Sequence, residues 1–157
     1  MDSCSATCCP REVNRREARA GDSLAAMSTT TEHLITGVDF LGLPTRDLDR
    51  AVEFYGQTLG LHRSAYRPER HHAEFETGNL TLNIMNAEKM GLEHTTLRNP
   101  LALHVDDVAA ARARLESRGV SFAGDIFDTG VCHMAFFQDP DGNSLMLHHR
   151  YAPRTPE

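Results

Sequence analysis

The sequence predicts an α+β domain made of two tandem copies of one β-α-β-β-β unit, and three observations lead to this fold class. Short runs of alternating apolar and polar residues, typical of half-buried strands, recur between turn-forming residues. Two stretches with the apolar period of a helix each follow an aspartate and end at a glycine, the usual residues at those positions. Laying Phe40 over Pro100 also places Asp47 over Asp107, at a constant offset of 60 residues. The order of elements therefore follows from an internal repeat.

The first copy of the unit occupies residues 35–86. Its predicted elements are a strand at 35–44, a helix at 48–59, and strands at His62–Arg67, His71–Thr77 and Leu80–Met85. Asp47 is the expected N-cap of the helix, and Gly60 the residue that ends it. Gly78 and Asn79 form the expected turn between the last two strands.

The second copy occupies residues 99–150 and follows a linker at 87–98. Its predicted elements are a strand at about 100–105, a helix at 107–118, and strands at Val120–Phe127, Val131–Gln138 and Ser144–His149. The last two strands are joined by Asp139-Pro140-Asp141-Gly142-Asn143, a run of five turn formers that predicts a tight hairpin. Residues 151–157 are expected to be a C-terminal tail.

The first 33 residues differ in composition from the rest of the chain. They are polar and lack sustained periodicity, so they would bury too little apolar surface to offset the entropy of ordering, and we expect a disordered tail. Met27 begins a segment that resembles an ordinary protein start. We therefore hypothesise that residues 1–26 come from an upstream start and have no function.

Composition restricts the function classes. The chain of 157 residues has 40% hydrophobic residues and a net charge of −6, which argues against nucleic acid or an anionic membrane as a partner. No apolar run approaches the roughly 18 residues of a membrane span, and no secretory signal is visible. Three of the four cysteines lie in the first nine residues, which matches no zinc or disulfide framework. We expect a cytoplasmic protein with a small-molecule ligand.

Strand periodicity also nominates a cavity. If Leu82 and Ile84 lie under the first helix, then Asn83 and Met85 face the opposite side of their sheet. The same argument turns Pro100, together with Ala102 and His104, away from the second helix. Two sheets that are each covered on one face can curl their other faces into a cup.

Residues 37–150 resemble the vicinal oxygen chelate superfamily, which includes glyoxalase I, extradiol dioxygenases, and fosfomycin and bleomycin resistance proteins. Beside the repeat itself, the resemblance is carried by the runs Leu43-Pro44-Thr45-Arg46-Asp47-Leu48-Asp49-Arg50-Ala51-Val52-Glu53-Phe54-Tyr55, Leu59-Gly60-Leu61, Val105-Asp106-Asp107-Val108 and Phe137-Gln138-Asp139-Pro140-Asp141-Gly142-Asn143. The resemblance implies the glyoxalase/bleomycin-resistance fold. It leaves the activity open, because this fold hosts many functions.

Metal-dependent members of the superfamily bind a divalent ion through four side chains on the first and last strands of the two units. The resemblance places these positions at Phe40, Asn83, Pro100 and Met146. Phenylalanine and proline side chains have no lone pair to donate, and a methionine thioether suits soft ions such as Cu(I). We therefore expect no metal and no other cofactor. The resemblance is then to the bleomycin-resistance type of member, which sequesters a ligand without metal chemistry.

The residues expected to contact a small apolar or aromatic ligand are Phe40, Asn83, Met85, Pro100, Met146, His148, His72 and Arg67. Aromatic rings and adaptable thioethers are typical walls of such a pocket. Arg67, at the rim, would meet an anionic group of the ligand. The alternative is that Phe40, Pro100 and Met146 fill the cup as additional core.

Two enzymatic alternatives use other polar residues. His72, Glu74, His133 and His148 could form a displaced divalent-metal site, as in a lyase or dioxygenase, because imidazole and carboxylate suit Zn²⁺ and similar ions. His133 and Glu74 could instead act as an acid–base pair in a metal-free isomerase or hydrolase. The resemblance further implies a homodimer. Members of the superfamily complete each cup with a partner's module or exchange modules, and the sequence does not fix which arrangement applies here.

Overall fold

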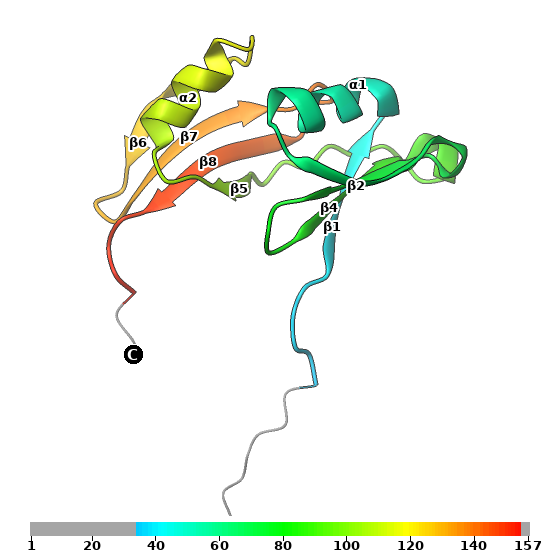
Figure 1. Ribbon diagram of the computed structural model, residues 1–157, viewed down its shortest axis with the longest axis horizontal. Helices are drawn as coiled ribbons and strands as arrows, with labels where there is room; N and C mark the ends of the chain where they lie inside the picture. Colours follow the sequence, from blue (N-terminus) through cyan, green and yellow to red (C-terminus); the bar gives the residue numbers. More distant parts are fainter. Residues whose placement is uncertain (1–33, 155–157) are drawn as a thin grey trace, which may run out of the picture. The chain divides into compact units, whose positions relative to one another are not determined.

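Both helices start where their capping residues predict. The computed structural model describes residues 34–154 (Figure 1). Helix α1 spans Leu48–Glu53, and the carboxylate of Asp47 accepts a hydrogen bond from the backbone N–H of Arg50 at 3.1 Å. Helix α2 spans Val108–Glu116, and Asp107 accepts from the N–H of Ala110 at 2.9 Å. Each aspartate satisfies an N–H group that has no partner inside its helix, which confirms both predicted N-caps.

The first helix is shorter than predicted. Beyond Glu53 the chain forms one π-helical segment, η1, at Phe54–Thr58, in which the N–H of Leu59 bonds to the carbonyl of Phe54 at 2.8 Å. In this wider turn a side chain on Gly56 would lie 3.4 Å from the ring of Phe75. The apolar spacing of residues 48–59 is compatible with either kind of turn, so periodicity alone does not separate them.

The strands form two mixed sheets of four strands each, with the orders β1-β4-β3-β2 and β5-β8-β7-β6 (Figure 1). The strands are β1 Phe40–Thr45, β2 His62–Arg67, β3 His72–Glu76, β4 Thr81–Asn86, β5 Leu101–His104, β6 Phe122–Asp128, β7 Cys132–Gln138 and β8 Ser144–Arg150. The pairs β1–β4 and β5–β8 are parallel and the remaining pairs antiparallel. This arrangement confirms the predicted fold class. The first strand begins at Phe40 rather than at residue 35.

Two short 3₁₀ segments, η2 at Pro68–Arg70 and η3 at Glu88–Met90, lie in the connections. Among the described residues, no helix is long and apolar enough to cross a membrane, and the cellular location stays a prediction from composition. The predicted N-terminal tail at residues 1–33, with its alternative start at Met27, lies outside the described residues, as do residues 155–157.

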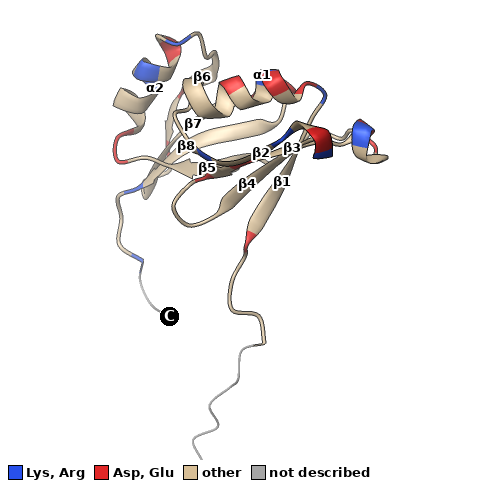
Figure 2. Cartoon of the chain, turned by 45° about the vertical axis from the view of Figure 1, so that its right-hand side comes forward, with Lys and Arg blue, Asp and Glu red and all other residues tan. Residues whose placement is uncertain are grey.

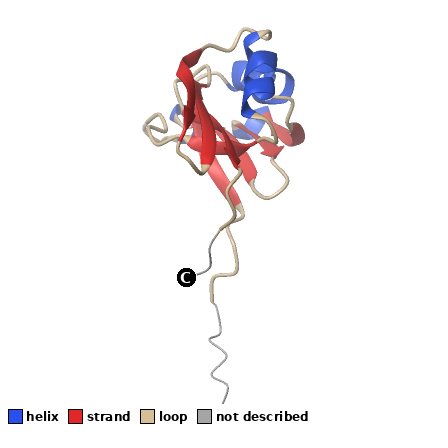
Figure 3. Cartoon of the chain, turned by 90° about the vertical axis from the view of Figure 1, so that its left-hand side faces the viewer, coloured by secondary structure: helices blue, strands red, loops and turns tan. Residues whose placement is uncertain are grey.

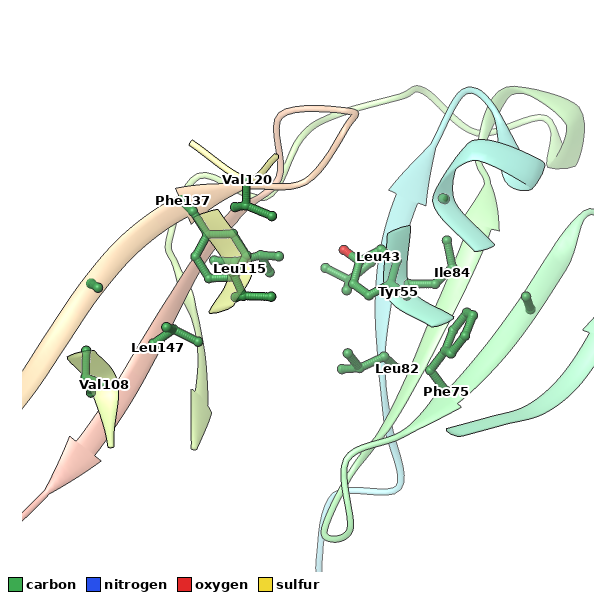
Figure 4. Close-up of a cluster of buried hydrophobic side chains, with 14 residues drawn as sticks. Leu43, Tyr55, Phe75, Leu82, Ile84, Val108, Leu115, Val120, Phe137 and Leu147 are labelled. Atoms are coloured by element: carbon green, nitrogen blue, oxygen red, sulfur yellow. The ribbon is translucent and has the colours of Figure 1, made fainter. Parts of the chain in front are cut away.

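The helices cover one face of each sheet, and the core lies between helix and sheet (Figures 3 and 4). On β4, Leu82 and Ile84 are at most 1% exposed, as their alternation predicts. On β8, Leu145 and Leu147 hold the equivalent positions and are at most 3% exposed. The alternate residues of both strands are only partly buried. Each sheet therefore has a helix-covered face and an open face, as the sequence predicts.

The predicted hairpin between β7 and β8 joins the second unit to the first through buried hydrogen bonds. The hydroxyl of Tyr55 in η1 donates to Asp139 at 2.8 Å, and the side-chain amide of Asn143 donates to the same carboxylate at 2.7 Å and to the carbonyl of Pro44 at 2.8 Å. Tyr55 and Asn143 are fully buried, and Asp139 is 6% exposed. Buried polar groups without partners are costly, so this network favours one placement of the two units.

The neighbouring residue Asp141 extends this connection. It accepts hydrogen bonds from the hydroxyl of Thr45 and, at 2.8 Å, from the backbone N–H of Arg46. The side chain of His94 in the linker is 2% exposed, and its Nε2 lies 4.0 Å from Asp141. Within the described chain this Nε2 is buried without a hydrogen-bond partner. Gly142 completes the turn with a φ of 86°, a conformation that residues with a Cβ rarely adopt.

We predict that Tyr55→Phe lowers the free energy of unfolding by about 1–3 kcal/mol, because Asp139 loses a buried donor. The matched control is Tyr66→Phe, whose hydroxyl bonds to Asp49 at a solvent-exposed position, so that its loss should leave the stability nearly unchanged. Urea denaturation of both variants measures the difference. Equal effects would show that the buried network does not join the units as described.

The same hydrogen bond predicts a pH dependence. Burial, and then the Asp139 carboxylate, raise the pKa of the Tyr55 hydroxyl far above its usual value. A raised folded pKa means that the stabilisation is complete below the unfolded pKa of about 10 and is lost above it. The unfolding free energy of the wild type minus that of Tyr55→Phe should therefore be constant between about pH 7 and 9. Above pH 10 it should fall by about 1.4 kcal/mol per pH unit. A constant difference at alkaline pH would contradict the assignment.

Candidate functional site

The open face of the first sheet is polar at its centre. The strand register places Asn83 beside Gly42 on one side and Glu74 on the other. His72 lies one step further along β3, with its Nδ1 at 3.3 Å from the side-chain oxygen of Asn83 and 3.9 Å from Glu74. The predicted residues His72, Glu74 and Asn83 are thus brought together, and they can donate and accept hydrogen bonds to a ligand.

Glu76 adds a fixed negative charge to this face. Its carboxylate accepts hydrogen bonds from Ser64 at 2.6 Å and from Thr81 at 2.9 Å. These two bonds hold the pKa of Glu76 below its usual value, so this carboxylate stays ionised at neutral pH. The sequence analysis did not single out Glu76 as a site residue, although its alternation with Phe75 places it on the same face as Glu74.

Met85 covers the end of this face nearest the helix α1 N-terminus. The register sets it between Pro44 and His72, and its methyl group lies where a side chain at position 42 would project, 3.0 Å from an ideal Cβ. Gly42 therefore leaves the space that the methionine occupies. The predicted contact residue Met85 is half-buried and adjacent to His72.

The open face of the second sheet is mainly apolar. Met146 lies between Ala102 and Phe136, and the next row places His148 between His104 and Met134. Met134, Phe136 and Met146 are half-buried. Met134 and Phe136 are not among the predicted site residues. Their place on this face follows from the period of two, because Ala135 and Phe137 on the same strand face the core. Two thioethers and one aromatic ring thus lie side by side.

His133 lies on the opposite face of this sheet. It pairs with His149 in the register, its ring is 4.9 Å from that of Tyr151, and its Nε2 is 3.5 Å from Asp128. The expectation that His133 shares a space with Glu74 is therefore wrong for the single chain. Alternation explains this, because His133 has the same parity as the core residues Ala135 and Phe137.

The carboxylate of Asp128 lies beside His133 and also accepts hydrogen bonds from two other groups. The backbone N–H of Gly130 and the hydroxyl of Tyr151, each at 2.8 Å, hold the pKa of Asp128 below its usual value. The same hydrogen bond raises the pKa of Tyr151. This cluster lies beside the first residues of α2, separate from the open faces.

The remaining predicted residues lie at the margins. Arg67 is exposed and pairs with His72 in the register, which agrees with a place at the rim. Phe40 is 59% exposed at the start of β1. Pro100 is also exposed, and it lines a cavity of about 660 Å³ together with Phe136 and Phe122. That cavity does not include Phe40, Asn83 or Met146, so it does not unite the four family positions in one chain.

A divalent metal does not fit these four positions. Phe40 and Pro100 supply no donor atom, and Met146 supplies only a thioether, a poor ligand for hard or borderline ions. Elsewhere in residues 34–154, no three His, Cys, Asp or Glu side chains are grouped so that they could hold one ion. His72 and Glu74, the core of the predicted displaced site, have no third such ligand beside them within the described part of the chain.

Comparison with known proteins identifies the family. The model of the Glyoxalase/Bleomycin resistance protein/Dioxygenase superfamily matches residues 37–147. A lactoylglutathione lyase of Haemophilus influenzae is 30% identical over 111 residues, which cover 63% of this chain and 82% of that protein.

Solved structures agree with this match. TnmS3, an antibiotic binding protein from Streptomyces sp. CB03234, is 28% identical with a TM-score of 0.65, over 76% of this chain and 99% of its own. A glyoxalase/bleomycin resistance protein/dioxygenase from Nocardioides, with 24% identity, has a TM-score of 0.65 over 81% of this chain and 91% of its own, which shows a shared fold. The repeat, the two mixed sheets and these matches together show that the chain belongs to the glyoxalase/bleomycin resistance protein/dioxygenase superfamily.

Proposed function

We propose that this protein binds a small apolar or aromatic organic ligand, without a metal, in a cup formed by the open faces of its sheets. The observation that carries the proposal is that Met134, Phe136 and Met146 lie next to one another on the open face of the second sheet. Methionine and phenylalanine side chains provide adaptable apolar walls for flat ligands. The His72, Asn83 and Glu74 group on the first sheet provides hydrogen bonds that orient such a ligand.

The absence of metal follows from donor chemistry at the family's four positions. Hard and borderline cations need oxygen, nitrogen or thiolate donors, and Asn83 alone among the four offers one. A reaction that depends on metal coordination at this place has no ligands to support it. Sequestration of a ligand needs only shape and apolar contact, which the second sheet offers.

The relatives support both binding and enzymatic alternatives. TnmS3 carries the description of an antibiotic binding protein, and the Haemophilus relative that of a lactoylglutathione lyase. Their identities to this chain are 28% and 30%, and this difference is too small to decide between a binding function and an enzymatic one. The side chains at Phe40, Pro100 and Met146 favour the binding function, because they replace donors with carbon and sulfur.

A homodimer is part of this proposal. In the described chain, β1 is an outer strand and leaves one edge unpaired within its sheet. Phe40 on β1 is a large apolar side chain exposed at 59% beside such an edge. Exposed strand edges and apolar side chains together favour pairing with another chain.

We predict that Met146→Lys abolishes binding of apolar ligands, because a charged side chain would stand in the apolar row beside Phe136. A library of aromatic and hydrophobic metabolites, screened by thermal unfolding, should contain compounds that stabilise the wild type. The stabilisation should reach about 2.7 kcal/mol at a hundredfold excess of ligand over Kd.

Met90→Lys is the matched control, since Met90 is 48% exposed in η3 and outside both open faces. This variant should keep the response to each compound. If Met146→Lys remains folded and responds to the same compounds as the control, the ligand does not bind at the proposed cup.

For the dimer, we predict that Phe40→Glu raises the dissociation constant at least about tenfold, because it places a charge at the interface. The control is Val131→Glu, a similarly exposed apolar residue in the β6–β7 connection. Sedimentation velocity over a range of concentrations measures both. A monomeric wild type, or equal dissociation of the two variants, would remove the dimer from the proposal.

A further inference from the structure

A second cavity lies where the two units meet on the helix side. It has a volume of about 500 Å³. Its walls come from the end of η1, the β3–β4 turn, strand β5 and one side of α2, and we call it the junction groove. It is lined by Leu59, Gly60, Leu61, Thr77, Asn79, Leu80, Leu82, Leu101, Ala102, Leu103, His104, Val105, Ala111, Arg114, Leu115, Arg118 and Leu147.

The apolar part of the junction groove is aliphatic. Its floor consists of Leu82, Leu115 and Leu147, each at most 7% exposed, and the partly buried leucines and valine of the list above form the walls. No phenylalanine, tyrosine or tryptophan lines it. The cavity beside Pro100, in contrast, is lined by several phenylalanines. A flexible hydrocarbon chain fits aliphatic walls, where dispersion contacts replace water along its whole length.

The charges at the junction groove are all basic. Arg114 and Arg118 line it, and no aspartate or glutamate does, although the whole protein has a net charge of −6. Arg118 donates to the carbonyls of Thr58 at 2.7 Å and Gln57 at 3.2 Å, so its position is fixed. Figure 2 shows a basic segment on α2 and an acidic segment next to it. The local charge therefore suits an anion.

Arg114 is the guanidinium available to that anion. Its neighbour on the helix, Arg112, bonds to Glu116 at 2.8 Å and to the carbonyl of Gly124 at 2.9 Å. Arg114 is exposed, and no carboxylate of the described residues lies within ion-pair distance of it. A guanidinium binds a carboxylate through two parallel hydrogen bonds, a geometry that a neutral headgroup does not reproduce.

Strand β5 sets the length of the ligand. Leu101 to Val105 all line the junction groove, and at the rise of a strand this stretch covers about 13 Å, the length of an extended chain of about ten carbons. We propose that the junction groove binds an unbranched aliphatic carboxylate of about eight to ten carbons, with the chain along β5 and the carboxylate on Arg114. This site is separate from the apolar cluster around Met146, and it requires that the partner of the proposed dimer leaves β5 accessible.

The test is isothermal titration calorimetry of the full-length protein with decanoate, octanoate and hexanoate below their micelle concentrations. Each methylene removed should weaken binding by about twofold to fourfold. Decanol, which has the same chain and no charge, should bind about tenfold more weakly than decanoate. Equal binding of decanol and decanoate would overturn the role of the arginine.

Three variants locate the site. Arg114→Gln should weaken decanoate binding about tenfold, whereas Arg50→Gln, an equal charge change on an exposed arginine of α1, should leave it unchanged. Ala111→Phe would fill the junction groove and should abolish binding. Met146→Lys, in the cup, should have no effect on decanoate.

Three outcomes would refute the proposal. If Arg114→Gln binds decanoate as the wild type does, or if Met146→Lys removes the binding, the fatty acid occupies another place. If decanoate binds only to protein diluted to monomer, and hydrogen exchange of Leu101 to Val105 is slowed by raising the protein concentration, a second copy covers the junction groove. Loss of decanoate binding together with unchanged metabolite binding would leave the proposed function intact.

Discussion

The hydrogen bond between Tyr55 and Asp139 is the constraint on which the arrangement of the two units depends. It links η1 of the first unit to the β7–β8 turn of the second, and Asn143 in the same turn bonds both to Asp139 and to the carbonyl of Pro44. These groups are buried, so each needs its partner when the units pack. The turn between β7 and β8 therefore fixes how the sheet that carries Met146 is held against the first unit.

The open faces that this arrangement presents differ in chemistry. The first sheet offers imidazole, amide and carboxylate groups around Asn83, while the second offers thioethers and an aromatic ring around Met146. A ligand held between two such faces would have an apolar side and a hydrogen-bonding side. Both faces derive from one strand pattern that was duplicated, and they diverged through the residues that alternate with the core.

Local patterns predicted most of the fold and only part of the site. Leu82 and Ile84 fix the two faces of β4, and Asp47 and Asp107 fix the helix starts, because each depends on near neighbours in the chain. The Tyr55–Asp139 contact joins residues 84 positions apart, and no periodicity reports such a pairing. The burial of His94 was not predicted either, because it depends on Asp141, which is distant in the sequence. His133 failed differently, since its alternation with Met134 was available and would have placed it on the helix side.

We propose that carbon and sulfur occupy the positions where metal-dependent relatives hold an ion. The test is elemental analysis by mass spectrometry of the native protein, purified without a tag or chelator. The amount of each metal is divided by the amount of protein to give ions per chain. We expect that Zn, Ni, Mn, Fe and Co together stay far below one ion per chain, before and after dialysis against each metal. About one equivalent of any of them, retained through gel filtration, would contradict it.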